Sequence, residues 1–169
     1  QVVKMLDTDK QSILKAGKIL RFGYVRDDEL SQNPYVTSFN YALSKCDSYA
    51  RQLEHLMVKR DELRAKNQMK SKEYDEVEHK IKEIRGEIRK EERKYVERAQ
   101  VIGTTISRAT IDPMFEERQF DLVMFDEVSM AYVPQVIAAA ALAKEKFMCV
   151  GDFRQLAPIS QSPDSRVLQ

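Results

Sequence analysis

An excess of charge of one sign and long apolar runs are both missing from this sequence. Its 28 basic and 27 acidic residues leave a net charge of +1, so composition alone gives no reason to expect binding to nucleic acid or to a membrane. No apolar run approaches the roughly 20 residues that a membrane-spanning helix needs. The chain also begins at Gln1, without a signal peptide or an initiator methionine. We therefore expect a piece of a longer protein that works in the cytoplasm, or in the nucleus of a eukaryotic cell.

Cysteine is scarce as well. Cys46 and Cys149 lie far apart in the sequence, and their separation matches no metal-binding spacing. We expect two reduced thiols, which are typical of a cytosolic protein. Hydrophobic residues make up 43% of the 169 residues and charged residues 33%, so the chain can bury a core. Its length fits one domain, or one domain with an insertion.

Both ends of the chain alternate short apolar segments with helix-compatible stretches. We predict strands over 18–23, 120–125 and 146–150, a strand that runs from Gln100 into a turn at 103–105, and a helix over 133–146. Segment 120–125 is apolar apart from Asp121, which indicates a strand covered on both faces. The strand–helix order predicts an α/β fold with a parallel sheet. Ligands bind at the carboxyl ends of such strands.

The middle of the chain, residues 41–98, follows a different pattern. Key residues recur at alternating spacings of three and four, which is a heptad seam with one charged interruption in each half. Residues 66–71 suit a turn between the halves, so we predict an antiparallel helical hairpin, a coiled coil, inserted into a domain formed by 1–40 and 99–169. The two seams are Ala42, Cys46, Tyr49, Leu53, Leu56, Arg60 and Leu63, and Tyr74, Val77, Ile81, Ile84, Ile88, Glu91 and Tyr95.

Charges of both signs are mixed over this hairpin. Between Arg51 and Arg98 the sequence has 15 basic and 12 acidic side chains. A segment that binds a polyelectrolyte would favour one sign, so the mixture indicates a solvated coiled-coil surface with intrahelical ion pairs. A stalk that contacts a partner or nucleic acid is the alternative.

Two acidic residues, Asp126 and Glu127, directly follow strand 120–125. Acidic pairs are common on protein surfaces, but two carboxylates at the tip of a buried strand are costly unless a cation lies nearby. In a nucleotide-hydrolysing site, one such acid positions a magnesium ion and the other activates water. We therefore predict a magnesium–nucleotide site at this position.

Two further motifs follow predicted strands. Gly151, Asp152 and Gln155 come after strand 146–150; an ordinary turn with a glycine at positive φ is the simpler interpretation, but the combination is rarer by chance than an acidic pair. Thr104 and Thr105 follow Gly103 and offer hydroxyls and backbone amides that suit a phosphate contact. Without context, a simple loop is an equally good interpretation of these threonines.

In this order the motifs resemble motifs Ic, II and III of superfamily 1 helicases. The matching segments are Gly103-Thr-Thr, Asp126-Glu-Val-Ser-Met and Gly151-Asp-Phe-Arg-Gln-Leu-Ala-Pro, and the resemblance spans most of the chain. They are most similar to the branch that contains the nonsense-mediated-decay RNA helicase and its bacterial relatives. Met130 departs from the family, which often has glutamine there. The resemblance implies a partial RecA-like (P-loop NTPase) domain, ATP-dependent helicase activity, ATP and Mg²⁺ as cofactors, and single-stranded DNA or RNA as the partner.

The resemblance also implies a role for each site residue. Asp126 would hold the magnesium ion through water, and Glu127 would act as the general base toward the attacking water. Gln155 would sense the γ-phosphate, while Gly151 and Asp152 shape that loop. Thr104 and Thr105 would contact the backbone of a single strand independently of its base sequence.

One part of an ATP site is missing from the sequence, the Gly-x-x-x-x-Gly-Lys-Ser/Thr loop that holds phosphates. The only Gly-Lys pair, Gly17-Lys18, is followed by Ile19 where a hydroxyl is required. The second motor domain of the family would follow the last residue. We therefore expect the chain alone to be inactive as an ATPase. In the family fold the strand before motif III pairs with the phosphate-loop strand, so we also expect strand 146–150 to form an open edge that leads to self-association or poor solubility.

Two other functions fit part of the sequence. An ATPase of the chromosome-organising type also joins a coiled-coil arm to paired acids, although such arms are usually far longer. The Gly-Asp-x-x-Gln-Leu-x-Pro pattern does not belong to that class. A non-enzymatic coiled-coil interaction module on an inert α/β base is the third possibility.

Overall fold

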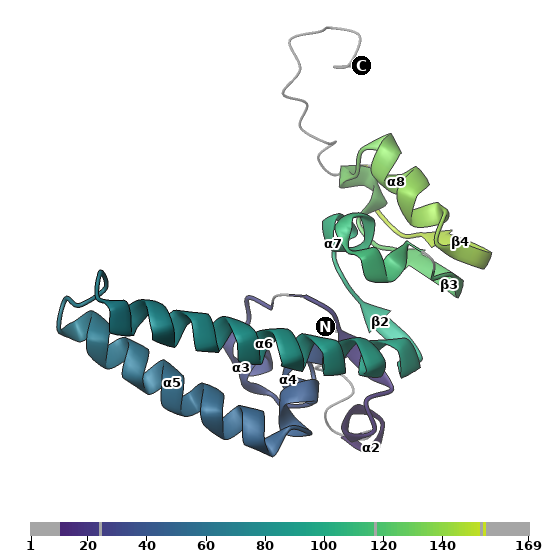
Figure 1. Cartoon of the computed structure of the whole chain (residues 1–169). Helices are drawn as coiled ribbons and strands as arrows, with labels where there is room; N and C mark the ends of the chain where they lie inside the picture. Colours follow the sequence, from purple (N-terminus) through teal and green to yellow (C-terminus); the bar gives the residue numbers. More distant parts are fainter. Residues whose placement is uncertain (1–10, 24, 117, 153, 155–169) are drawn as a thin grey trace, which may run out of the picture. The chain divides into compact units, whose positions relative to one another are not determined.

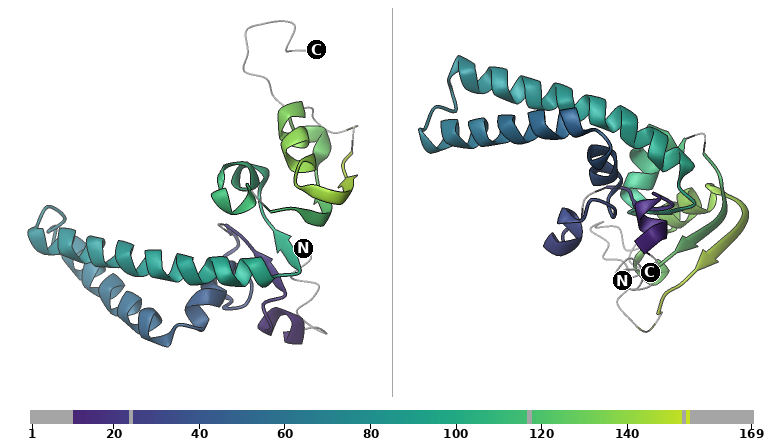
Figure 2. Two further views of the ribbon diagram at one scale, coloured as in Figure 1. Left: turned by 45° about the vertical axis from the view of Figure 1, so that its right-hand side comes forward. Right: turned by 90° about the horizontal axis from the view of Figure 1, so that it is seen from below.

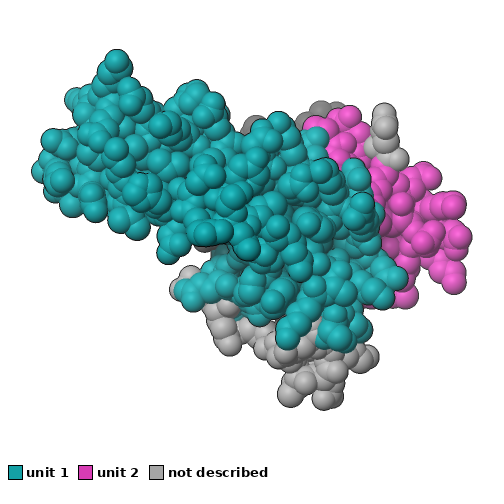
Figure 3. Space-filling model, turned by 60° about the horizontal axis from the view of Figure 1, so that its bottom comes forward, with its two compact units in different colours: residues 1–104 teal, residues 105–169 magenta. Residues whose placement is uncertain are grey.

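The computed structural model of the chain describes residues 11–23, 25–116, 118–152 and 154. The chain divides after Thr104 into two compact units, residues 1–104 and 105–169 (Figure 3). Each unit combines helices with one parallel sheet of two strands, so the mixed α/β fold is compatible with part of a P-loop NTPase-like domain. The predicted division into 1–40 with 99–169 and an inserted 41–98 stays a prediction, because compact packing does not reveal which segment is an insertion.

The first unit contains one short sheet and a set of helices. Strands β1 (Ile19–Arg21) and β2 (Val101–Gly103) pair in parallel, with Ile19 opposite Val101. Leu20 and Phe22 are almost fully buried. The elements are α2 (Gln11–Lys15), β1 (Ile19–Arg21), α3 (Asp28–Gln32), α4 (Ser38–Ser44), α5 (Asp47–Ala65), α6 (Lys72–Arg98) and β2 (Val101–Gly103).

A tight turn at Gly17 connects α2 to β1. Gly17 has a left-handed φ of 67°, its N–H donates to the carbonyl of Leu14, and the Lys18 N–H donates to the carbonyl of Ile13. This pair of hydrogen bonds is the Schellman motif that ends many helices. The Gly17-Lys18 pair therefore has a structural role, the termination of α2.

Helices α5 and α6, which we call the helix pair, lie side by side and run in opposite directions (Figures 1 and 2). Residues 66–71 connect them. Apolar side chains of the pair and of α4 form one cluster, and most of its members are seam positions of the three-and-four pattern. The buried members are Ala42, Leu53, Leu63, Val77, Ile81, Ile84 and Ile88, and Tyr49, Leu56, Tyr74 and Tyr95 are among the partly buried residues packed against them.

The first helix of the pair begins later than the predicted start near residue 41. Helix α4 ends at Ser44, and Cys46 leaves the helical region with φ −122° and ψ 65° before α5 begins at Asp47. The Ser44 hydroxyl donates to the Tyr41 carbonyl at 2.8 Å, an interaction that competes with continuation of a helix. Both α4 and α5 contact α6, so the break allows two helices with different directions to pack on the same partner.

A buried polar contact attaches α6 to the start of α4. The Ser38 hydroxyl, which is fully buried, donates to Oε1 of Glu92, and Glu92 is only 8% exposed. The neighbouring Glu91, the predicted interruption of the seam, instead forms an ion pair with Lys94. The heptad pattern placed the acidic interruption at residue 91, one position before the glutamate that is actually buried.

The second unit is built around strands β3 (Phe120–Phe125) and β4 (Ala143–Cys149). These strands pair in parallel, with Phe125 opposite Cys149, and helix α8 (Val133–Ala140) contacts both of them. The rings of Phe125 and Phe147 meet edge to face, 6.5 Å apart between centroids. The elements are α7 (Ile106–Ile111), a 3-10 turn η1 (Pro113–Phe115), β3 (Phe120–Phe125), a 3-10 turn η2 (Val128–Met130), α8 (Val133–Ala140) and β4 (Ala143–Cys149).

Three expectations for this unit are wrong in detail. The helix predicted over 133–146 ends at Ala140, and the strand predicted over 146–150 begins at Ala143 and ends at Cys149. The Phe120 N–H donates to the Leu142 carbonyl at 2.8 Å, so strand pairing prevails over the helix preference of residues 141–146. Strand β3 is also not covered on both faces within the described residues, since Leu122 and Met124 are 45% and 62% exposed.

The predicted single sheet is corrected as well, because the described strands form two separate sheets of two strands each. Both sheets are nevertheless parallel, as the strand–helix order predicts. Both cysteines are free thiols. None of the helices in the described ranges is long and apolar enough to cross a membrane.

Candidate functional site

The segment after β3 carries the two acidic residues in a sharp turn. Glu127 adopts a left-handed conformation with φ 55° and ψ 39°, which is uncommon for a residue with a side chain. Its N–H donates to Oδ1 of Asp126 at 3.0 Å, and η2 follows directly. Backbone strain of this kind costs on the order of 1 kcal/mol and is concentrated at functional sites. Asp126 and Glu127 are both exposed. The expectation that they end a fully covered strand is wrong, because Leu122 and Met124 of β3 are exposed as well.

Parallel pairing brings the end of β4 beside this turn. The Val150 N–H donates to the Phe125 carbonyl at 2.8 Å, and the Val128 N–H donates to the Val150 carbonyl at 3.0 Å. In the sequence, the two acids therefore lie between Phe125 and Val128, and both of these residues form a backbone hydrogen bond with Val150. The structure thus brings the segment after β3 together with the segment after β4, at the carboxyl edge where parallel sheets bind ligands.

Gly151 continues this edge, and its backbone lies close to the turn after the acids. A Cβ atom at this position would lie 3.1 Å from the backbone nitrogens of Val128 and Ser129 and from Cγ1 of Val128. A side chain at residue 151 would therefore have to push the turn after the acids away. The close packing of two backbones therefore favours glycine at this position, and a positive φ, the simpler interpretation of the sequence, is not its reason.

Asp152 is exposed, and its Oδ1 accepts the N–H of Arg154 at 2.9 Å, which closes a local turn. Its carboxylate therefore shapes the loop that follows β4. Gln155, the third predicted residue of this motif, lies outside the described residues, as do Leu156 and Pro158.

Thr104 and Thr105 lie on either side of the boundary between the two units. Thr105 is the N-cap of α7, because its hydroxyl oxygen accepts the Arg108 N–H at 3.3 Å. The Thr104 hydroxyl oxygen is buried and has no hydrogen-bond partner within the described ranges. One threonine therefore has a local structural role that the sequence did not indicate, and the predicted nucleic-acid contact of both stays a prediction.

Ser129 was missed by the sequence reasoning. It lies in η2, two residues after Glu127, and its backbone nitrogen borders Gly151. Its hydroxyl oxygen is buried and makes no hydrogen bond to any described residue. The only available signal was its position just after the acidic pair, since a serine two residues beyond an acidic pair is common on protein surfaces.

The donor set at the end of β3 fits a hard divalent cation. Carboxylate oxygens are the ligands that Mg²⁺ prefers, and Mg²⁺ usually keeps several water ligands and needs few from protein. Among the described residues, no three His, Cys, Asp or Glu side chains gather into a complete metal site. Asp126 and Glu127 are exposed and can reach such an ion through water.

The comparisons with known proteins agree with this arrangement at the level of family. A family model described as an AAA domain matches residues 4–163, which include both acids, Gly151 and the whole helix pair. No curated protein matches the sequence.

Proposed function

Because this chain belongs to the AAA domain family, a domain of superfamily 1 helicase-like proteins, we propose that it is the magnesium and water half of the ATP site of a nucleic-acid motor. The parent protein is accordingly a helicase or translocase that hydrolyses ATP and moves on single-stranded DNA or RNA. Its branch is that of the nonsense-mediated-decay RNA helicase and its bacterial relatives, and the three motifs described above correspond to motifs Ic, II and III.

The observation that carries this proposal is the junction of β3 with β4. The Val128–Val150 and Val150–Phe125 hydrogen bonds hold the acidic turn against the loop that begins at Gly151. A change in one segment, such as the loss of a phosphate, therefore reaches the other through backbone atoms alone. Two peptide segments that meet in this way suit a site that couples hydrolysis to a conformational response.

Each predicted residue has a role in this proposal. Asp126 positions the magnesium ion through a water molecule, and Glu127 accepts a proton from the attacking water. The ion supplies charge neutralisation for the phosphates when it is bound. Gly151 and Asp152 shape the loop, and Gln155 senses the γ-phosphate. The left-handed turn at Glu127 supports the roles of the acids, since it directs the chain away from the strand immediately after Asp126.

Nucleic acid is the proposed partner, and Thr104 and Thr105 are the proposed contacts with its backbone. Such contacts do not depend on base sequence, in line with a motor that moves along any strand. The helix pair is proposed to be a coiled-coil stalk of this motor. If the protein were only a coiled-coil interaction module, ATP turnover would be absent from the intact protein.

The test uses the intact protein that contains this chain. We expect ATPase activity that single-stranded nucleic acid stimulates, and a Glu127→Gln variant that loses roughly 10²-fold or more of the turnover, because the general base is removed. Binding of a fluorescent ATP analogue is expected to persist in that variant. The chain alone is expected to show no turnover above background.

Glu145→Gln is the matched control, because Glu145 is an exposed acid on β4 away from the junction. Its turnover should equal that of the parent protein. Equal turnover in the Glu127→Gln protein would contradict the assignment of the base. Loss of nucleotide binding in both variants would instead indicate damage to the fold.

A further inference from the structure

The turn that joins α5 to α6 has charge of one sign, unlike the chain as a whole. Residues 64–72, which we call the basic turn, include one arginine, three lysines and no acidic residue. Lys66, Lys70 and Lys72 are exposed, and none of them forms an ion pair with the part of the chain that the structure describes. Met69 lies among them and is 52% exposed. The basic turn therefore carries three exposed lysines and one exposed methionine close together in the sequence.

The basic turn is held in a defined conformation by its own hydrogen bonds. Asn67 has a left-handed φ of 54° and ends α5, with backbone N–H groups of residues 67 and 68 donating to the last turn of that helix. The Ser71 hydroxyl donates to the Gln68 carbonyl at 2.7 Å and accepts the Tyr74 N–H at 3.1 Å, which caps α6. A surface that is ordered in advance loses less conformational entropy when a partner binds.

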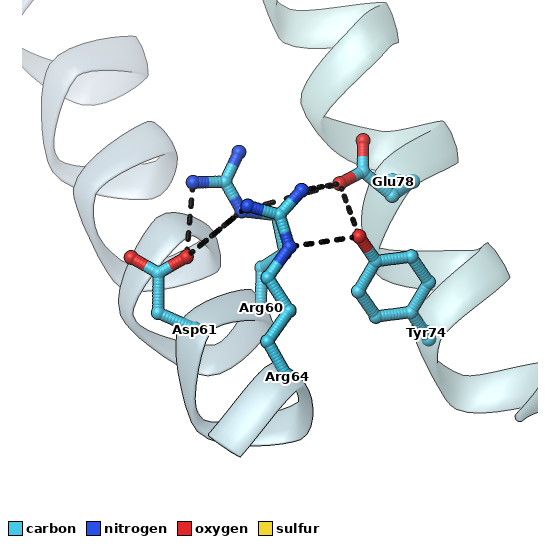
Figure 4. Close-up of polar contacts among 5 residues, drawn as sticks. All are labelled: Arg60, Asp61, Arg64, Tyr74 and Glu78. Atoms are coloured by element: carbon cyan, nitrogen blue, oxygen red, sulfur yellow. Dashed lines mark hydrogen bonds and ion pairs between the residues drawn. The ribbon is translucent and has the colours of Figure 1, made fainter. Parts of the chain in front are cut away.

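Acidic side chains in the first turns of α6, next to the basic turn, form ion pairs with basic residues of α5. Lys59 Nζ lies 2.7 Å from Glu73, and this hydrogen bond lowers the pKa of the Glu73 carboxyl. Glu78 lies 3.9 Å from Arg60 Nε and 3.6 Å from Arg64 Nη2. These acids are therefore paired with α5, and within the described residues none of them forms an ion pair with a lysine of the turn, although the charge of Lys66 also contributes to the lowered pKa of Glu73. Figure 4 shows the network around Glu78, which includes Arg60, Asp61, Arg64 and Tyr74.

We propose that the basic turn is a docking site for a short acidic segment of a partner protein, with one apolar side chain of that segment against Met69. The three lysines provide charge complementarity to carboxylates. Methionine adapts to apolar partners of different shapes, which suits a contact on an open surface. The proposal does not depend on ATP hydrolysis by the parent protein.

The extent of the positive charge favours a short peptide over nucleic acid. It covers one turn, and beyond it Glu62, Asp75 and Glu76 are exposed on the two helices. A polyanion that continued along the helix pair would meet these carboxylates and be repelled. A short acidic segment that ends at the turn avoids them, whereas a strand of nucleic acid with regularly spaced phosphates does not.

Fluorescence anisotropy with the whole chain tests the proposal. The probe is a short fluorescein-labelled peptide of glutamates with a central leucine, and the comparison ligand is a single-stranded oligonucleotide of the same charge. The combined variant Lys66→Gln, Lys70→Gln and Lys72→Gln should weaken peptide binding by about tenfold or more, since three charge pairs are lost. Met69→Ser should weaken binding of this peptide several-fold, and it should leave binding of a second glutamate peptide, without the leucine, unchanged.

The control variant removes the same charge from the exposed side of α6 by Lys80→Gln, Lys82→Gln and Arg89→Gln. It should bind the peptide within about twofold of the parent chain, because these side chains lie outside the basic turn. Equal losses in both triple variants, or no binding of the peptide to the parent chain, would overturn the proposal. The proposal would also be overturned if the chain bound the oligonucleotide more tightly than the peptide and the basic-turn variant lost that binding. This result would favour a nucleic-acid contact instead. Circular dichroism verifies that each variant is folded.

Discussion

Gly17 and Gly86 occupy contrasting environments in the first unit. Gly17 has a φ of 67°, and a Cβ atom there would lie 2.6 Å from the ring of Tyr41, which is itself 5% exposed. Gly86 lies within α6, and a Cβ atom there would have no neighbour within 4 Å. One glycine is therefore required by the structure, and the other only reduces the stability of its helix.

We expect Gly17→Ala to lower the free energy of unfolding by about 2–4 kcal/mol, because it adds both left-handed strain and a clash with a buried ring. Gly86→Ala should raise it by about 0.5–1 kcal/mol through helix propensity. Urea unfolding followed by circular dichroism measures both changes. Equal midpoints for the two variants would mean that the Gly17 turn does not pack against Tyr41 in solution.

Some features of Asp126 and Glu127 could be predicted from the sequence, and others could not. Their position after a strand was readable from the sequence, because an apolar run that ends in two carboxylates is a local pattern. The left-handed conformation of Glu127 was not readable, since glutamate has no intrinsic preference for it. The buried hydroxyl of Ser129 became evident only when Gly151 was brought against its backbone.

At the scale of elements, the three-and-four spacing agrees with the buried positions of the helix pair, whereas the inserted coiled-coil hairpin stays a prediction. The three-and-four spacing identifies the buried side of α5 and α6 because a helix repeats every 3.6 residues. The break at Cys46 and the early end of α8 were missed. Both outcomes depend on contacts with another element. The break at Cys46 accompanies the packing of α4 on α6, and α8 ends early because residues 143–149 pair with β3.

The β3–β4 sheet carries the expectation of self-association. Met124 and Met148 are opposite each other in the parallel register, and together with Leu122 they are 45–62% exposed. Lys144 and Lys146 on β4 are also exposed and discourage strand addition at that part of the edge. Association through the edge of strand 146–150 stays a prediction. Because these lysines oppose it, we expect a second copy of the chain to pack over the exposed methionines of this sheet.

Light scattering over a range of concentrations should show a mass that rises with concentration. Met124→Lys should shift the chain toward the monomer without loss of stability, because Met124 is 62% exposed. Val58→Lys, on an exposed apolar residue of α5, is the control and should leave association unchanged. A strictly monomeric chain at high concentration would show that the exposed sheet does not recruit a partner.

At the scale of the whole molecule, the apolar core is distributed unevenly. Of the buried apolar side chains among the described residues, only Phe115 and Ala139 belong to the second unit, and the rest belong to the first. Since burial of apolar surface is the dominant favourable term in folding, the second unit has less to stabilise it.

Amide hydrogen exchange should reflect this difference. Amides in the middle of α6, around Ile81 and Ile88, are expected to exchange slowest, because both side chains are at most 1% exposed. Amides of β3 and β4 should exchange much faster, through local opening of the second unit. Slower exchange in β3 than in α6 would mean that a contact outside the single chain protects the sheet. Measurement at several protein concentrations would then show whether self-association provides that contact.

The sequence by itself determined the periodic features of this protein: which residues of the helix pair face each other, that the sheets are parallel, and that the acidic and glycine motifs follow strands. These features depend on neighbours in the chain, because helix and strand periods are local properties of the backbone. Only the tertiary structure decided where α4 and α8 end, that Glu127 turns left-handed, and that Val150 joins the two motifs by backbone hydrogen bonds. Those outcomes require atoms from distant segments to compete for the same backbone groups, and no local pattern encodes which segment prevails.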